Sequence, residues 1–258
     1  MGNQHGEFIW YELMTSDAVA AADFYGAVVG WKARAFDESA GGYRILAASD
    51  ADVAGLLPIT PEMAAKGVRP GWLGYIGVDD VDATAAAVVE AGGTQHLPPT
   101  DIPGVGRFAV LADPQGAVFQ IMRGSMEGTS TVFAPMESGH CNWNELATSD
   151  QNAALSFYID RFNWEKGDAM PMDGAGEYRF INRNGEMIGA VMNRMDEAAP
   201  PAWTFYFGVD DIDAAVKAVA EKGGAIHYGP AEVPGGAFII VVADPEGAMV
   251  GFVGPRRQ

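Results

Sequence analysis

The spacing of hydrophobic positions changes along the chain between the period of a strand and the period of a helix. Residues 8–15 (FIWYELMT) predict a strand. Residues 17–29 predict a helix, because Ser16 or Asp17 can accept the free N–H groups of a first turn and Gly30 can end it. Three short β-rich segments follow (WKARAF, GYRILAAS and VAGLLPI). The order predicted is therefore strand–helix–strand–strand–strand.

The same order starts again at residue 72. A strand (WLGYIGV) leads into Asp79 and Asp80, which we interpret as helix caps. The helix after them ends at two glycines, and TQHL, RFAVLA and AVFQIM predict three more strands. One helix face is predicted to carry the apolar positions Val81, Thr84, Ala85, Val88 and Val89.

The whole arrangement is duplicated. Residues 10–31 align without gaps with residues 143–164, with 11 of 22 positions identical. Residues 72–80 match 203–211 at six of nine positions, and ADPQG matches ADPEG. We therefore predict a first domain over residues 1–126, a linker over 127–139 and a second domain over 140–258.

The predicted fold class is α+β, with tandem domains built from four βαβββ modules. Two modules side by side should curl into one concave sheet trough per domain. A trough lined by alternate strand residues suits a small-molecule ligand.

Composition narrows the possible partners. The chain has 34 acidic and 16 basic residues, a formal net charge of −18, which repels phosphate backbones and anionic lipids. We expect no nucleic-acid partner and no membrane partner. Cys141 is the single cysteine, and no segment reads as a secretion signal, so we expect a cytoplasmic protein.

Four motifs carry a resemblance to a known family. They are S-D after the first strand, F-Y in the helix, G-W after it, and D-P-x-G before the last strand. This pattern resembles the vicinal oxygen chelate superfamily of glyoxalase I, bleomycin-resistance proteins and extradiol dioxygenases. It is most similar to two-domain bacterial glyoxalase-like proteins, also described as hydroxylases, which begin each half with W-x-E-L-x-T-x-D. The resemblance implies the glyoxalase-like fold, which hosts several chemistries.

In metal-dependent members of that superfamily, His, Gln or Glu on the first and last strands of a module pair hold the ion. The equivalent positions in this sequence are, on the first strands, Trp10, Leu73, Trp143 and Thr204 and, on the last strands, Gln120 and Gly251. Gln120 alone could ligate, and one neutral amide cannot hold a divalent ion. We therefore expect no metal and no other cofactor.

Strand alternation predicts the residues that face each trough. Trp10 and Glu12 should share one face of the first strand, and Trp143 and Glu145 should repeat this in the second half. Tyr75 and Tyr206 are expected on the opposing walls. The expected ligand-binding set is Trp10, Tyr75, Gln120, Trp143 and Tyr206. Such a lining suits a flat or aromatic molecule held by stacking and one polar anchor.

Glu12 and Glu145 allow two interpretations. An apolar trough disfavours the charged form of a carboxylate, which is a condition for general acid–base catalysis. Alternatively, each glutamate accepts a hydrogen bond or anchors the ligand. The recurring His96 and His227 are expected to be solvated or structural, and the recurring Arg44 and Arg179 are expected in surface salt bridges.

Three functions remain open. The first is a metal-independent small-molecule protein, either a binder or an enzyme that uses Glu12 or Glu145. The second is a metal-dependent glyoxalase (lactoylglutathione lyase) or extradiol-dioxygenase-type enzyme, with an unusual site built from Glu12, Gln120 or His96. The third is a non-catalytic scaffold with vestigial clefts. Since the duplication supplies internally what single-domain relatives obtain by dimerising, we expect a monomer or a weak homodimer.

Overall fold

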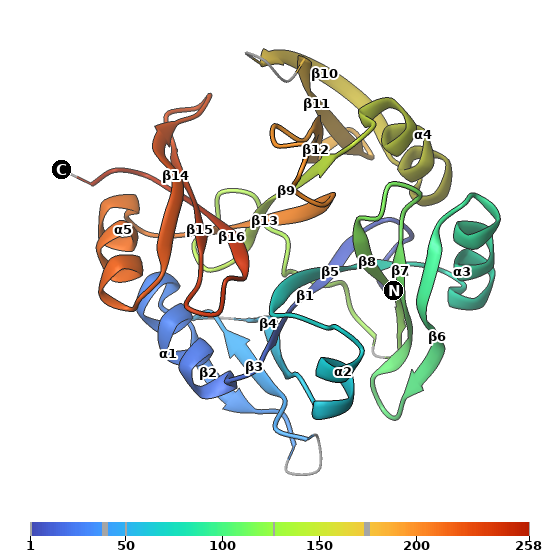
Figure 1. The fold of residues 1–258 in the computed structure, drawn as a ribbon, viewed down its shortest axis with the longest axis horizontal. Coiled ribbons are helices and arrows are strands. Elements are labelled where there is room, and N and C mark those ends of the chain that lie inside the picture. Colours follow the sequence, from blue (N-terminus) through green and yellow to red (C-terminus); the bar gives the residue numbers. More distant parts are fainter. Residues whose placement is uncertain (1, 38–40, 50, 126, 173–175, 258) are drawn as a thin grey trace. The chain divides into compact units, whose positions relative to one another are not determined.

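The computed structural model of the chain describes residues 2–37, 41–49, 51–125, 127–172 and 176–257. Met126, the predicted end of the first domain, lies outside the described residues. Within these ranges the chain forms two eight-stranded sheets, one from each half of the sequence (Figure 1). The α+β prediction of tandem domains is confirmed. None of the described helices is both long and apolar enough to span a membrane.

The predicted module of one strand, one helix and three strands occurs four times. The first contains β1 (Phe8–Thr15), α1 (Ala18–Val29), β2 (Lys32–Ala35), β3 (Arg44–Ala47) and β4 (Asp52–Pro58). The second contains β5 (Gly71–Gly77), α3 (Val81–Glu90), β6 (Thr94–Ile102), β7 (Gly106–Ala112) and β8 (Val118–Gly124). Between them lies one unpredicted short helix, α2 (Pro61–Ala65), capped by the Thr60 hydroxyl.

The second half repeats this order. The third module contains β9 (Cys141–Thr148), α4 (Gln151–Phe162), β10 (Glu165–Met172), β11 (Gly176–Arg183) and β12 (Glu186–Asn193). The fourth contains β13 (Ala202–Gly208), α5 (Ile212–Glu221), β14 (Ala225–Glu232), β15 (Phe238–Ala243) and β16 (Met249–Gly254). Within each module the first strand pairs in parallel with the last, and the remaining neighbours pair antiparallel.

An aspartate begins each of the four long helices. Asp17 accepts hydrogen bonds from two N–H groups of the first turn of α1, so the cap is Asp17 and not Ser16. Asp80, Asp150 and Asp211 each accept one such N–H group at the start of α3, α4 and α5. At the other end of α1, Gly30 has φ 87°, the left-handed conformation that glycine adopts without strain.

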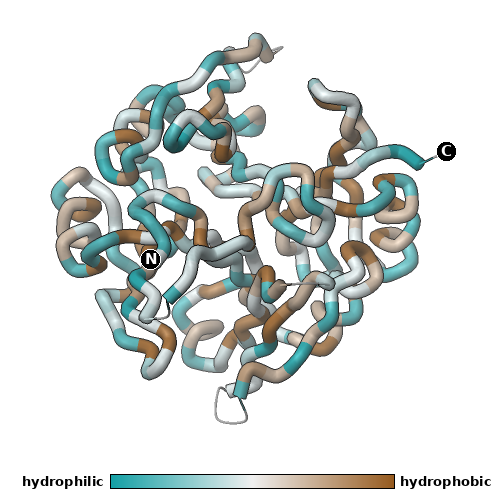
Figure 2. The backbone as a smooth tube through the Cα atoms, turned by 180° about the vertical axis from the view of Figure 1, so that it is seen from behind, coloured by the Kyte–Doolittle hydropathy of each residue, from teal (hydrophilic) through white to brown (hydrophobic). Residues whose placement is uncertain are grey.

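The predicted apolar face of α3 needs one correction. Val81, Ala85 and Val88 are buried, but Val89 is 48% exposed. At 100° per residue, Val89 lies about 40° beyond Ala85, at the edge of the buried stripe. Figure 2 colours the chain by hydropathy, and brown apolar stretches alternate with teal polar ones along the tube.

The compact units of the molecule do not follow the two halves of the sequence. Unit 1 comprises residues 1–9, 74–130 and 144–204, and so contains most of the second and third modules. Unit 2 comprises residues 10–73, 131–143 and 205–258, and so contains most of the first and fourth modules. Each unit therefore combines a module from each half of the chain.

A buried chain of hydrogen bonds joins the two modules of unit 2. The indole N–H of Trp72 donates to the Tyr25 hydroxyl at 2.8 Å, and this hydroxyl donates to Asp244 at 3.0 Å. The other oxygen of Asp244 accepts the backbone N–H groups of Glu246 and Ala248. The F-Y and D-P-x-G motifs thus meet, although they lie at opposite ends of the sequence.

Unit 1 contains the same Trp–Tyr–Asp chain. Trp203 donates to Tyr158 and Tyr158 donates to Asp113, each at 3.1 Å. The G-W tryptophans are also structural, because Trp31 donates to the Gly139 carbonyl within unit 2 and Trp164 to the Gly6 carbonyl within unit 1. The motifs that carry the family resemblance therefore form the cores of the units. These contacts give them a structural role.

Candidate functional site

Side chains of β1 alternate as predicted. Tyr11 and Leu13 are fully buried, and the Tyr11 ring packs on Phe205 at 5.0 Å. Trp10 and Met14 point the other way and are half-buried. The face that carries Trp10 therefore keeps some exposed surface, which a ligand can contact.

Glu12 lies on this face and is paired with a tyrosine. The Tyr43 hydroxyl forms a hydrogen bond with the Glu12 carboxylate and accepts the indole N–H of Trp10 at 3.0 Å. To reach Glu12, Tyr43 crosses β4 at Gly55, the register partner of Glu12. A Cβ atom at Gly55 would lie 1.8 Å from the Tyr43 hydroxyl, so glycine is needed there. All four residues belong to unit 2.

The second half repeats the pair within unit 1. The Tyr178 hydroxyl, on β11, donates to the Glu145 carboxylate at 2.7 Å. The Tyr178 ring meets Phe180 edge to face at 5.7 Å. Glu145 is half-buried, whereas Glu12 is 5% exposed. We call Glu12–Tyr43 and Glu145–Tyr178 the Glu–Tyr pairs.

The Tyr43 hydroxyl is held as a neutral donor. Burial raises the pKa of Tyr43 well above its ordinary value, and the neighbouring Glu12 charge raises it further. A neutral phenol that donates to a carboxylate orients the carboxylate and leaves its remaining lone pairs for another donor. A ligand hydroxyl or an acidic C–H group is a donor of this kind.

The residues predicted on the opposing walls are buried. Tyr75 is the register partner of Gln120, and the two are 4% and 2% exposed. In unit 2, Tyr206 is 4% exposed and is the register partner of Gly251. A Cβ atom at Gly251 would lie 2.2 Å from the Tyr206 ring, so this ring fills the space that a side chain on the last strand would need. Trp143 is half-buried on β9.

The residues at the family's metal positions do not fit a divalent ion. The indole N–H of Trp10 is directed at Tyr43, and Gly251 offers no ligand atom. Gln120 offers a single amide. In the part of the chain that the structure describes, no three side chains of His, Cys, Asp or Glu gather closely enough to hold a metal.

The remaining candidates lie on the surface or in the core. His96 and His227 are exposed on β6 and β14. Arg179 forms an ion pair with Glu177. Burial raises the pKa of Cys141 to about 12, which leaves no thiolate for nucleophilic chemistry near neutral pH.

Tyr43 and Tyr178 were not among the residues predicted for the site. The sequence does contain a sign that these tyrosines matter, since both halves place Tyr-Arg at equivalent positions (GYR and EYR). The prediction followed the arginines of these dipeptides, whereas the hydrogen bonds to the glutamates come from the tyrosines.

A family model described as the Glyoxalase/Bleomycin resistance protein/Dioxygenase superfamily matches the chain twice, over residues 7–121 and 138–252. The chain belongs to this superfamily. The two matches agree with the duplication and with the four βαβββ modules. The resemblance predicted from the motifs is confirmed.

Two relatives match nearly the whole chain. The protein named "Putative glyoxylase CFP32" of Mycobacterium tuberculosis is 32% identical over 254 residues, which cover 96% of this chain and 95% of the relative. "Anthracycline biosynthesis protein DnrV" of Streptomyces peucetius is 33% identical over 251 residues, which cover 93% of this chain and 90% of the relative.

Solved structures share the fold at low identity. A Mn(II)-bound glyoxalase from Novosphingobium aromaticivorans has a TM-score of 0.66 at 19% identity, over 98% of this chain and 83% of that chain. The 2,2',3-trihydroxybiphenyl 1,2-dioxygenase of Sphingomonas wittichii RW1 has a TM-score of 0.67 at 16% identity, over 98% and 90%. At this identity the likeness concerns the fold alone.

Proposed function

We propose that this protein binds flat, hydroxylated aromatic molecules at its Glu–Tyr pairs without a bound metal ion. The observation that carries the proposal is the recurrence of a tyrosine-oriented glutamate in both units. At Glu12, the tryptophan that takes the place of a metal ligand also donates to the pair. At this pair an aromatic body can stack on the half-buried Trp10 indole while a phenolic hydroxyl donates to Glu12.

The name of one relative supports the ligand class. The protein DnrV is named for anthracycline biosynthesis. Anthracyclines are fused-ring aromatic compounds with phenolic hydroxyls, which is the chemistry that a glutamate acceptor beside an indole favours. The net charge of −18 also favours a neutral ligand over an anionic one.

The test is calorimetric titration with 2,6-dihydroxyanthraquinone in buffer that contains EDTA. We expect binding to the intact chain and weaker binding of the 2,6-dimethoxy analogue, which has no hydroxyl donor. Glu12→Gln and Glu145→Gln should each weaken one class of site about tenfold or more, because a hydrogen bond to a charged group contributes about 1.5–3 kcal/mol.

Glu90→Gln is the matched control, since Glu90 is an exposed glutamate at the end of α3 and should leave the titration unchanged. The proposal fails if binding requires added Mn²⁺, Fe²⁺ or Zn²⁺. It also fails if Glu12→Gln and Glu145→Gln bind as the parent chain does.

A second candidate function is proton transfer, which the tyrosine-held orientation of each glutamate supports. The glutamate would take a proton from an acidic carbon of the ligand, and the same carboxylic acid would return one. Deuterium exchange at the methylene carbon of anthrone, followed by NMR, tests this activity. Faster exchange than in buffer that is lost in Glu12→Gln or Glu145→Gln supports it, and exchange unchanged by both substitutions contradicts it.

A further inference from the structure

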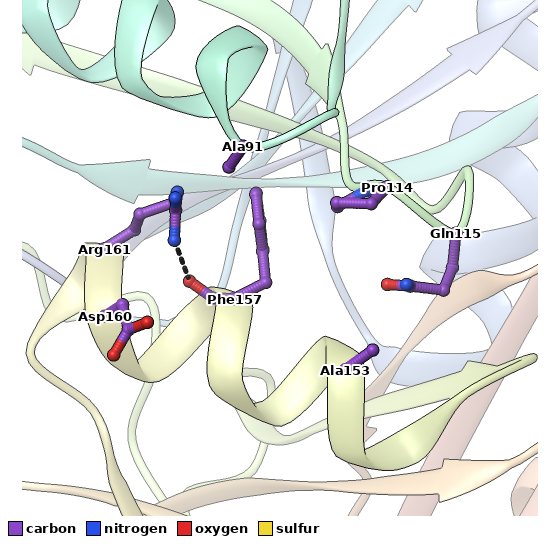
Figure 3. Close-up of a pocket in the computed structure, with 7 residues that line it drawn as sticks. All are labelled: Ala91, Pro114, Gln115, Ala153, Phe157, Asp160 and Arg161. Carbon is purple, nitrogen blue, oxygen red and sulfur yellow. Dashed lines mark hydrogen bonds between the residues drawn. The ribbon is translucent and has the colours of Figure 1, made fainter.

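A depression of ≈ 290 Å³ lies in unit 1, and no residue of the Glu–Tyr pairs lines it (Figure 3). Helix α4 forms one side, and the end of α3 with the D-P-Q-G loop forms the other. The lining residues are Ala91, Pro114, Gln115, Ala153, Phe157, Asp160 and Arg161. We call this depression the α4 pocket.

Two polar atoms at the α4 pocket have no hydrogen-bond partner within the described residues. They are Gln115 Oε1, which accepts, and Arg161 Nε, which donates, and both are buried. In Figure 3 the Gln115 amide points from its loop toward the space beside Phe157. Unsatisfied buried polar atoms are rare in folded proteins, and each calls for a partner.

The Arg161 guanidinium is held in a defined orientation. It lies 4.8 Å from the centroid of the Phe157 ring, and its Nη1 donates to the Phe157 carbonyl at 3.3 Å. This leaves the edge formed by Nε and Nη2, which suits side-on, two-point binding of a carboxylate. Arg161 has no ion-pair partner in the part of the chain described, although the protein carries more than twice as many acidic as basic residues.

Unit 2 provides an internal comparison, because the duplication gives each pocket residue a counterpart. Gln115 corresponds to Glu246, whose carboxylate accepts hydrogen bonds from Thr15 and Ser16. Arg161 corresponds to Val28, which is 7% exposed. In unit 2 these positions therefore complete the local packing, and they leave no polar atom without a partner.

In unit 2 an ion pair also joins α1 and the end of α5, and the equivalent residues of unit 1 cannot form one. Ala91 corresponds to Lys222, whose ammonium group pairs with Asp23 at 2.7 Å. A Cβ atom at Gly224 would lie 2.9 Å from the Phe24 ring, so that ring packs directly on the glycine. At the equivalent Gly93, the nearest atoms belong to Ala112 and Val88. The α4 pocket occupies the place that these contacts close in unit 2.

We infer that the α4 pocket is a second ligand site, for a small amino acid that carries a carboxylate and an ammonium group. The carboxylate binds the Nε–Nη2 edge of Arg161. The ammonium group donates to Gln115 Oε1, and the exposed Asp160 carboxylate adds attraction for it. The apolar walls formed by Ala91 and Ala153 fit a short carbon chain between the two charged ends.

The experiment titrates the intact chain with glycine, β-alanine, γ-aminobutyrate and 5-aminopentanoate, which separate the two charges by increasing lengths. Chemical shifts of the Gln115 side-chain amide and the Arg161 Nε–H group report on binding. We expect one member of the series to bind at least tenfold more tightly than acetate or ethylamine, each of which has only one of the two groups.

Two substitutions test the two polar groups. Arg161→Val, which copies unit 2 into unit 1, and Gln115→Leu, which removes the acceptor oxygen, should each weaken binding at least tenfold. Arg161→Lys should also weaken it, because lysine cannot bind a carboxylate with two parallel N–H groups. Glu246→Leu makes the same kind of change at the equivalent position of unit 2 and should leave binding unchanged. Thermal unfolding of each variant confirms that it is folded.

Three outcomes would overturn the inference. The first is no shift at either reporter group with any of the four amino acids. The second is binding that Arg161→Val and Arg161→Lys leave intact. The third is a crystal structure, soaked with the series, in which ordered water alone satisfies Gln115 Oε1 and Arg161 Nε.

Discussion

Tyr25 and Tyr158 are the central residues of the buried Trp–Tyr–Asp hydrogen-bond chains in the two units. Each is fully buried, accepts an indole N–H and donates to an aspartate that itself holds a turn. Removing either hydroxyl leaves an indole and a carboxylate oxygen without these partners. In a buried setting this costs more than the loss of the hydrogen bonds alone.

Tyr25→Phe should therefore lower the free energy of unfolding by about 2–4 kcal/mol, since two buried groups lose their partners. Tyr158→Phe should have a similar effect in unit 1. Denaturant unfolding measures both. Tyr228→Phe is the control, because Tyr228 is 57% exposed and should change stability by less than about 0.5 kcal/mol. Equal effects of all three substitutions would contradict the role given to the buried chains.

Asp244 and Asp82 should show opposite pH dependence. Burial raises the pKa of Asp244, whereas hydrogen bonds from Arg107 lower the pKa of Asp82. As the pH falls toward 4, folded Asp244 takes up its proton before the unfolded chain does, so the parent chain should gain stability relative to Asp244→Asn. Below about pH 4 the unfolded chain protonates Asp82 first, so the parent chain should lose stability relative to Asp82→Asn.

Unfolding curves of the parent chain and both variants between pH 7 and pH 3 measure these differences. Asp113→Asn in unit 1 should follow Asp244→Asn, because burial raises the pKa of Asp113 as well. Parallel trends for Asp244→Asn and Asp82→Asn would show that burial does not govern Asp244.

At the scale of elements, the aspartate caps set where the helices begin. Asp211 accepts the Asp213 N–H at the start of α5, whereas its neighbour Asp210 forms an exposed ion pair with Arg257 at 3.6 Å. Asp211→Ala should lower the free energy of unfolding by about 1 kcal/mol. Asp210→Ala should change it by about 0.5 kcal/mol or less. Similar losses from both, measured by denaturant unfolding, would contradict the capping assignment.

Most helices and strands could be predicted from the sequence, because the spacing of apolar residues within each one shows which side is buried. The strand β1 and the helix α1 follow from local spacing, and the caps follow from side-chain chemistry next to an apolar run. The helix α2 was missed, since five residues are too few to show a period and the described residues of the second half contain no equivalent helix. Val89 was assigned to the wrong face because an apolar side chain at a stripe's edge does not reveal whether a neighbour covers it.

The candidate site was only half predictable. Alternation on β1 places Trp10 and Glu12 on one face, but it says nothing about a side chain that crosses an intervening strand. Tyr43 reaches Glu12 only because Gly55 leaves room above β4. Sequence alone also could not show that Arg161 forms no ion pair with the described residues, because it shows the residue and not its neighbours in space.

At the scale of the whole molecule, each compact unit is built from one module of each half of the chain. Apolar spacing shows that a helix face is buried without showing which module covers it. The Tyr25–Asp244 and Asp113–Tyr158 contacts show that each half supplies one partner of both buried chains. A half of the chain alone therefore lacks the aspartate or tyrosine that its own module needs.

Fragments 1–126 and 140–258, expressed separately, should each unfold at lower temperature than the full chain or assemble into homodimers. Mixing the two fragments should restore the transition of the full chain. Calorimetry with light scattering measures both properties. A fragment that is monomeric and as stable as the full chain would contradict the crossed pairing, and mixing fragments that carry Tyr25→Phe should recover less stability.

The ring of Phe24, early in the sequence, rests on Gly224, late in the sequence. A substitution at either position must therefore be accommodated by a residue of the other copy. Compensating changes among homologues should accordingly be sought between the first and fourth modules and between the second and third.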